Sequence, residues 1–183
     1  MKRRHFLLTS LFAAPAEAFA HFAKFIRTNK GFKVAAGQDR FNGEIKFGGA
    51  YPNNLKVSGK DTDGNFCFFE GDSDRKGGPP LHLHKEQDEV FYVVEGKFRF
   101  QVGDEKFDLG AGDCLFAPRK VPHAFVHLGD EKSKMITIFQ PAGRMEAFFQ
   151  EYGKFAARPS VEVMKKLFSD HGMEIVGPPL PLG

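Results

Sequence analysis

The sequence predicts a mostly β protein, either a sandwich or a closed barrel, that ends in a short helical tail. From residue 33 onward, short apolar or alternating runs recur, and turn residues separate them at intervals of roughly eight to twelve positions. Helical periodicity begins only after residue 143. Strands do not alternate with helices, as they would in a parallel sheet. The chain has 183 residues, which is enough for one domain with a sizeable core.

The N-terminus has the pattern of an export signal over residues 1–20. Basic residues at positions 2–4 precede a mostly apolar run at 6–14, and alanines at 16, 18 and 20 offer small-residue cleavage sites. The run is too short to span a membrane. Arg3 and Arg4, followed by His-Phe-Leu, resemble a twin-arginine signal, so we expect export to the periplasm or beyond the bacterial cell. The alternative is an amphipathic N-terminal helix that stays attached.

Residues 21–183 are expected to form a single domain, with a barrel core at about 45–141. The stretch from Phe22 to Phe32 could be a helical arm or an extended lead-in. Asp61 to Asn65 superficially resembles a calcium loop, but its glycine is misplaced for an EF-hand, so it is interpreted as a hairpin turn. The clearest predicted strands are Asn65–Glu70, Val90–Val94, Lys97–Val102, Cys114–Ala117, Ala124–His127 and Lys134–Phe139.

The tail is expected to contain two helices within about 143–171. Large apolar residues recur at helical spacing from Met145 to Tyr152 and again from Val161 to Leu167. Pro159 and Ser160 fit a break followed by an N-cap. The helices should pack their apolar faces on the barrel, and the proline-rich stretch at 177–181 is predicted to be irregular.

Composition limits the classes of function. The formal charge of +3 is not gathered into a basic stripe, which argues against nucleic-acid binding. Twenty-two phenylalanines, with no tryptophan, could fill a core or line an apolar ligand pocket. Cys67 and Cys114 could pair in an oxidising compartment, although buried free thiols are the favoured interpretation.

The residues that carry chemistry begin with His82 and His84. Side chains alternate between the two faces of a strand, so these imidazoles would point to the same side and could share one metal ion. Glu89 follows just past a short polar turn and could return to that face from the neighbouring strand. Imidazole nitrogens suit transition metals, and a carboxylate adds a hard, charge-neutralising ligand.

His123 is the fourth candidate ligand. It follows a tight turn at Gly112, a strand and a loop bounded by Pro118 and Pro122. Three imidazoles and one carboxylate would leave two positions of an octahedron open, and open positions imply chemistry or ligand exchange. The predicted cofactor is therefore one divalent transition metal ion, namely iron, manganese, nickel, copper, cobalt or zinc.

These two segments resemble the motifs of the cupin superfamily. The first motif, G-x5-H-x-H-x3,4-E-x6-G, is matched from its first histidine through Gly96, although the leading glycine is out of register. The second, G-x5-P-x-G-x2-H-x3-N, is matched at Gly112, Pro118 and His123, whereas Lys120 and His127 replace its usual glycine and asparagine.

The resemblance covers about residues 45–141. It implies a jelly-roll barrel, a homodimer and the ligand set His82, His84, Glu89 and His123. The run at 88–96 and the tail at 176–180 look like the single-domain quercetin dioxygenase-like group.

The alternation of side chains along each strand predicts which residues line the pocket. Phe91 and Val93 share parity with Glu89 and should lie beside the metal, while Phe98 and Phe100 share one face of the next strand and could equally be core residues. His127 shares parity with Phe125 and could contact substrate, support the metal site or lie at the rim. Arg119 and Lys120 could attract an anion or simply belong to a solvated loop. The candidate pocket residues are Phe91, Val93, Phe98, Phe100, Phe125 and His127.

Three functions fit these features. The leading hypothesis is a metal-dependent dioxygenase-type oxidoreductase that acts on a small organic, possibly aromatic, substrate, with Glu89 as the base. The resemblance to quercetinases implies that role for Glu89. The first alternative is an isomerase or decarboxylase that uses the metal only as a Lewis acid. The second is a non-enzymatic module that binds a metal or a small ligand. Export through the twin-arginine route would deliver a folded barrel already loaded with metal.

Overall fold

The computed structural model describes residues 27–41, 46–47, 51–74, 76–129 and 131–182. The export signal predicted for residues 1–20 therefore lies outside the described residues. The strands are β1 (Lys46–Phe47), β2 (Tyr51–Val57), β3 (Cys67–Ser73), β4 (Pro80–His84), β5 (Asp88–Glu95), β6 (Phe98–Val102), β7 (Glu105–Leu109), β8 (Cys114–Ala117), β9 (His123–His127), β10 (Ser133–Gln140) and β11 (Met173–Pro179), and the helices are α1 (Met145–Tyr152) and α2 (Val161–Asp170).

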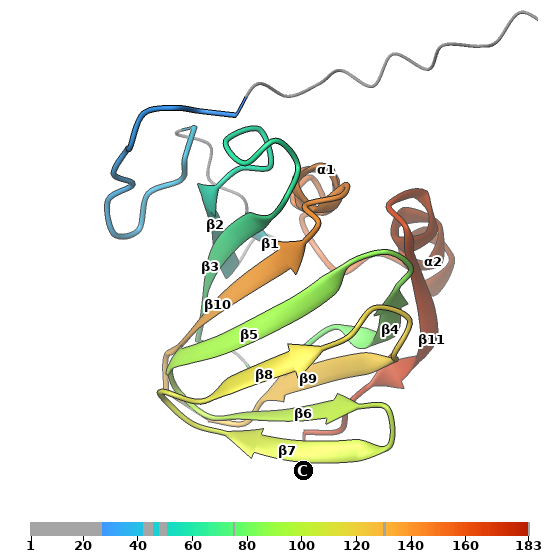
Figure 1. Cartoon of the computed structure of the whole chain (residues 1–183). Coiled ribbons are helices and arrows are strands. Elements are labelled where there is room, and N and C mark those ends of the chain that lie inside the picture. Colours follow the sequence, from blue (N-terminus) through green and yellow to red (C-terminus); the bar gives the residue numbers. More distant parts are fainter. Residues whose placement is uncertain (1–26, 42–45, 48–50, 75, 130, 183) are drawn as a thin grey trace, which may run out of the picture.

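Two antiparallel sheets form the barrel. One has the order β1-β2-β3-β10-β5-β8, and the other has the order β11-β4-β9-β6-β7. Figure 1 shows α1 and α2 at one end of this barrel, with α2 beside β11. The predicted fold class, an all-β cupin jelly-roll with a C-terminal helical extension, is confirmed. No helix of the described residues is long and apolar enough to cross a membrane.

Two apolar clusters fill the interior. The first joins β2, β3 and β10 to the helical tail, because Phe69 and Phe139 pack with Met145 and Phe168. The second lies between the sheets around Phe91, Phe98 and Phe100. The tail helices thus complete the core at one end of the barrel, as their apolar spacing predicted. Ser160 caps α2 by accepting a hydrogen bond from the backbone N–H of Val163, at 3.4 Å.

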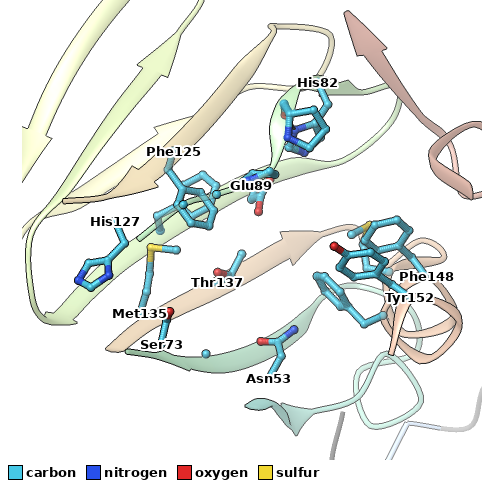
Figure 2. A pocket seen from close by; sticks show the side chains of 18 of the residues that line it. Asn53, Ser73, His82, Glu89, Phe125, His127, Met135, Thr137, Phe148 and Tyr152 are labelled. Carbon is cyan, nitrogen blue, oxygen red and sulfur yellow. Dashed lines mark hydrogen bonds between the residues drawn. The ribbon is translucent and has the colours of Figure 1, made fainter. Parts of the chain in front are cut away.

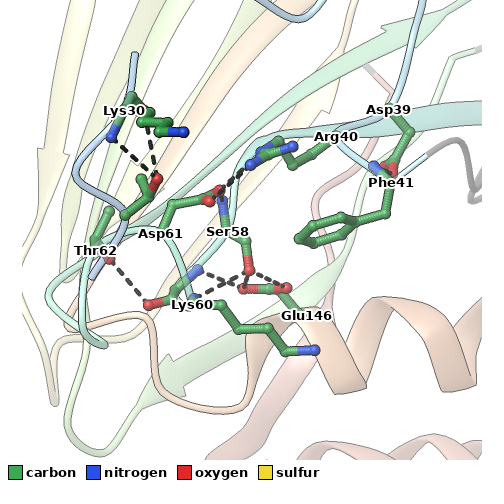
Figure 3. A network of polar contacts seen from close by, with 11 residues as sticks. Lys30, Asp39, Arg40, Phe41, Ser58, Lys60, Asp61, Thr62 and Glu146 are labelled. Atoms are coloured by element: carbon green, nitrogen blue, oxygen red, sulfur yellow. Dashed lines mark hydrogen bonds and ion pairs between the residues drawn. The ribbon is translucent and has the colours of Figure 1, made fainter. Parts of the chain in front are cut away.

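A polar network fastens α1 to the loop between β2 and β3 (Figure 3). The Glu146 carboxylate accepts hydrogen bonds from the Ser58 hydroxyl, at 2.9 Å, and from the backbone N–H of Gly59, at 2.6 Å. Asp61 accepts from the Arg40 guanidinium and from the backbone N–H of Ser58, each at 3.0 Å. The Asp61–Asn65 segment is thus the predicted turn between two strands.

β11 corrects one prediction. The proline-rich stretch from residue 177 was expected to be irregular, yet β11 extends to Pro179 and pairs with β4. β11 is the edge strand of its sheet, so a proline there removes no hydrogen bond that the interior of the sheet needs. The pairing register also shifts between Ile175 and Pro179, which accommodates the prolines.

Both cysteines are free thiols, but only Cys67 is buried. Cys114 is exposed, contrary to the expectation of two buried thiols, because it lies on the edge strand β8 opposite Tyr92, whose side chain is also exposed. From Arg27 to Phe32, the described part of the lead-in contains no helix.

Candidate metal centre

The four predicted ligands come from three strands and converge inside the barrel. His82 and His84 are both buried on one face of β4, because that strand alternates buried and half-buried positions. His123 on β9 pairs directly with His82, and Glu89 enters from β5 in the opposite sheet. One ligand atom from each residue can be chosen so that all four lie within 4.8 Å of one another.

The spacing around Glu89 matches that of ligands sharing one ion. Its Oε2 lies 2.8 Å from Nε2 of His123 and 3.2 Å from Nε2 of His84. Two ligands that lie at right angles, each about 2.1 Å from a metal, are about 3.0 Å apart. The side chains therefore stand where first-row metal ligands would stand.

Hydrogen bonds behind the imidazoles orient their free nitrogens. Nδ1 of His82 donates to the Pro80 carbonyl at 2.9 Å, and Nδ1 of His123 donates to the Val121 carbonyl at 3.0 Å. A carbonyl can only accept, so Nδ1 carries a proton in both rings and Nε2 is the atom that faces the cluster, where it could bind a metal. Both ring nitrogens of His84 are buried, and neither has a hydrogen-bond partner among the described residues. A metal ion at Nε2, the nitrogen that lies 3.2 Å from Oε2 of Glu89, would give one of these two atoms a partner.

The electrostatics favour the metal-binding protonation state at His82 and Glu89. Burial would lower the pKa of His123, but its contacts with Glu89 outweigh burial and raise that pKa. Burial, together with the neighbouring imidazoles of His123 and His84, lowers the pKa of His82 to about 3. Burial alone would raise the pKa of Glu89, but its contacts with His123 and His84 outweigh burial and lower that pKa to about 2. At neutral pH the cluster therefore offers a neutral His82 and an anionic Glu89, the forms that bind metals.

The loop before His123 is hydrogen-bonded to β4, the strand that carries His82 and His84. The backbone N–H of Lys120 donates to the His84 carbonyl at 2.7 Å, and Lys120 has a positive φ of 66°. This left-handed conformation explains why the cupin motif usually has glycine there. Arg119 forms a two-pronged ion pair with Asp88, with contacts of 2.6 and 3.0 Å. Arg119 thus fastens the loop to β5 and does not border the cavity described next.

A cavity of about 440 Å³ opens beside the cluster and is bordered by His82, His84 and Glu89. Figure 2 shows it between the two sheets, with Phe148 and Tyr152 of α1 at one side and His127 at the other. Among the predicted pocket residues, Phe91, Phe98, Phe125 and His127 border the cavity.

Val93 and Phe100 do not border the cavity, although both have the predicted parity. They lie in the apolar cluster between the sheets, where Phe100 packs against Phe91 and Phe125 with ring centroids 4.9 and 5.5 Å apart. Parity selects the face of a strand but does not give the depth along it. His127 is 1 % exposed, so it is not a rim residue.

Sequence reasoning missed the cavity residues on β2, β10 and the tail. Asn53 and Thr137 border the cavity, as do Tyr152 and Arg158 from the helical end. Tyr152 was assigned to a helix but not to the site. Asn53 belongs to a polar run with no alternation, so the sequence carried no signal for it.

Comparisons with known proteins agree with this geometry. Residues 74–139 match the family model described as the Cupin domain. Over 94 residues the chain is 29 % identical to quercetin 2,3-dioxygenase of Bacillus subtilis, a match covering 51 % of this chain and 27 % of that protein. Over 61 residues it is 31 % identical to the uncharacterized protein MJ1618 of Methanocaldococcus jannaschii, covering 33 % and 49 % of the two chains. The matches thus span about half or less of the length of these relatives.

Solved structures with the same architecture have low sequence identity. An RmlC-like cupin from Shewanella frigidimarina superposes with a TM-score of 0.52 at 23 % identity, over 64 % of this chain and 96 % of that one. The polyketide cyclase RemF from Streptomyces resistomycificus superposes with a TM-score of 0.50 at 22 % identity, over 61 % and 80 %. At such identities the similarity shows the fold alone. The chain therefore has the jelly-roll fold of the cupins, and its residues 74–139 match the Cupin domain.

Proposed function

We propose that this protein is a metal-dependent cupin enzyme that oxygenates a small, largely apolar organic molecule. His82, His84, Glu89 and His123 would hold one divalent transition metal ion, either iron, manganese, nickel, copper, cobalt or zinc. The observation that carries the proposal is the convergence of four buried ligand atoms at the wall of an apolar cavity. The similarity to quercetin 2,3-dioxygenase over half of the chain supports oxygenation as the reaction.

The bound ion would supply Lewis acidity and a fixed point for a substrate oxygen. The rings of Phe91, Phe98 and Phe125 would exclude water and hold a flat, apolar substrate. Glu89 would accept the proton of a substrate hydroxyl. Its contacts with His123 and His84 lower its pKa, so rotation of the carboxylate away from these two imidazoles would make it a stronger base.

Metal analysis and oxygen uptake test this proposal together. The purified protein should hold one transition metal ion per chain, and His84→Ala and His123→Ala should lose it. Glu89→Gln should keep part of the metal and lose oxygen uptake with quercetin and related phenols. Glu86→Gln is the matched control, since Glu86 is exposed and three positions away. Full metal content in both histidine variants would contradict the metal centre.

The same assay separates the other functions. Turnover without oxygen uptake would indicate an isomerase or a decarboxylase that uses the metal as a Lewis acid. Tight, stoichiometric binding without turnover would indicate a binding protein. An oxygen electrode, combined with product analysis of the same reaction, distinguishes these outcomes.

We also propose that residues 1–20 direct twin-arginine export of the folded, metal-loaded protein. Sites of nitrogen and oxygen ligands intrinsically bind copper and zinc more tightly than manganese or iron. Folding before export would let the site acquire manganese or iron inside the cell first. Replacing Arg3 and Arg4 by lysine should trap the precursor inside the cell. Normal export of that variant would contradict this route.

A homodimer is the expected assembly, and the outer surface of β5 and β8 is the candidate interface. Phe116 is 56 % exposed there, the side chains of Tyr92 and Val94 are exposed along the neighbouring strand β5, and β8 is an edge strand. Phe116→Glu should shift the protein to monomer in light scattering. Phe66→Glu, an exposed phenylalanine in the loop between β2 and β3, should leave the mass unchanged. A wild-type chain that is monomeric at high concentration would exclude the dimer.

A further inference from the structure

The side chain of Asn53 lies in the cavity wall and has no hydrogen-bond partner among the described residues. Asn53 is 6 % exposed and borders the cavity, and its amide forms no hydrogen bond with any residue in the described part of the chain. An amide carries two donor hydrogens and one acceptor oxygen, and buried polar groups are nearly always hydrogen-bonded. The amide is therefore open to whatever fills the cavity, and water or a ligand there can supply its hydrogen-bond partner.

The surrounding strands leave space for this amide. Asn53 on β2 pairs with Gly71 on β3, which also borders the cavity. A Cβ placed on Gly71 would lie 3.4 Å from Oδ1 of Asn53, which is an ordinary van der Waals distance. The Asn53 side chain thus lies directly beside Gly71 at the cavity wall.

A second polar group lies on the same sheet. Thr137 on β10 also borders the cavity, and no hydrogen bond of its hydroxyl to another described residue is present. Figure 2 shows Asn53 and Thr137 extending into the cavity below Glu89 and His82. Phe and Met side chains make up much of the remaining wall, and further polar groups, among them Lys76, Ser133 and Arg158, border the cavity elsewhere.

We propose that Asn53, assisted by Thr137, is a specificity-determining residue that hydrogen-bonds a second oxygen of the substrate. This inference rests on the proposed function in one respect, which is that the first substrate oxygen lies at the metal cluster. The substrate class is then a mostly apolar molecule that has a chelating oxygen pair and carries a separate hydroxyl or carbonyl group. A few polar groups in an otherwise apolar pocket fix orientation in this way.

The experiment compares ligands that differ only in the second oxygen. The zinc-loaded protein is used, because zinc has no redox chemistry and binding can be measured without turnover. The ligands are 3-hydroxyflavone, which has only the chelating oxygens, and its 7-hydroxy and 4′-hydroxy derivatives. The variants are Asn53→Leu and Thr137→Val, both close to isosteric. Asn54→Leu is the matched control, because Asn54 is 2 % exposed but does not border the cavity.

The wild-type protein should bind one of the two hydroxylated flavones about tenfold or more tighter than 3-hydroxyflavone. Asn53→Leu should abolish that preference while keeping the affinity for 3-hydroxyflavone, and Thr137→Val should reduce it about threefold. Asn54→Leu should keep the full preference. The melting temperature of Asn53→Leu should stay equal or rise, since leucine leaves no unbonded amide in the wall.

Three results would overturn the inference. One is a wild-type protein that does not prefer either hydroxylated flavone, and another is an Asn53→Leu variant that keeps the preference. The third is a clear fall in the melting temperature of Asn53→Leu, because it would show that the amide supports the fold. His84→Ala reports on the proposed function separately. If it binds all three flavones as tightly as wild type, the metal assignment fails. The affinities of wild type and Asn53→Leu for the three flavones still test the role of Asn53 independently.

Discussion

Removal of the Glu146 carboxylate should destabilise the protein by about 3 kcal/mol. Glu146 lies in the first turn of α1 and is the acceptor for the Ser58 hydroxyl and the Gly59 N–H. Ser58 is fully buried, so in Glu146→Ala its hydroxyl loses its side-chain acceptor without gaining free access to water. A hydrogen bond to a charged group contributes roughly 1.5–3 kcal/mol to stability. Because the Glu146 carboxylate is only half-buried, each of its two bonds is taken at the lower value, which gives about 3 kcal/mol in total.

The assay is urea unfolding followed by circular dichroism. For a domain of this size, about 3 kcal/mol corresponds to a fall in melting temperature of roughly 6–12 °C. The slope of the unfolding free energy against urea should stay constant, since the exposed area does not change. Glu146→Gln keeps an acceptor oxygen but loses the charge and its favourable interaction with the helix N-terminus, so we expect about half of the effect.

Glu105→Ala is the control, because Glu105 is exposed on β7 and has no side-chain partner among the described residues. The reasoning is refuted if Glu146→Ala loses less than about 1 kcal/mol, or no more than Glu105→Ala. In either case, the apolar contacts of α1 would hold the helix without the polar network.

Three further predictions concern other parts of the molecule. A thiol reagent should modify Cys114 in the folded protein but reach Cys67 only on unfolding, since burial raises the pKa of the Cys67 thiol; rapid modification of both would contradict the structure. Burial also raises the pKa of Tyr152, so its contribution to stability is complete below about pH 10 and is lost as the pH rises further. Melting curves of Tyr152→Phe should show a smaller alkaline fall than wild type. A Cβ at Gly78 would collide with the backbone of β9, so Gly78→Ala should lose roughly 1–3 kcal/mol in urea unfolding and bind zinc more weakly. Gly110→Ala, where the nearest atom is 4.0 Å away, should do neither.

The candidate ligands could be predicted because they depend on local rules. His82 and His84 share a face through the two-residue period of a strand, and that period survives any change of tertiary context. Glu89 and His123 could be added because the spacing of the cupin motifs encodes which strands are neighbours. The structure brings all four together, as the spacing indicated.

The far wall of the cavity could not be predicted from the sequence. β2 has the sequence Tyr-Pro-Asn-Asn-Leu-Lys-Val, which lacks alternation, and Asn53 and Asn54 are buried only because other elements cover them. Tertiary context overrides strand propensity at such positions. β11 was not predicted for a related reason. Prolines argue against a central strand but are tolerated in an edge strand, and the sequence does not show which of the two a segment will be.

The position of β4 makes the metal centre a late product of protein synthesis. β4 carries two of the four candidate ligands and lies between β9 and β11. On the ribosome, His82 and His84 emerge long before β11, the strand that will flank them on one side. The sheet around these two imidazoles is therefore complete only after β11 has been made and has paired with β4.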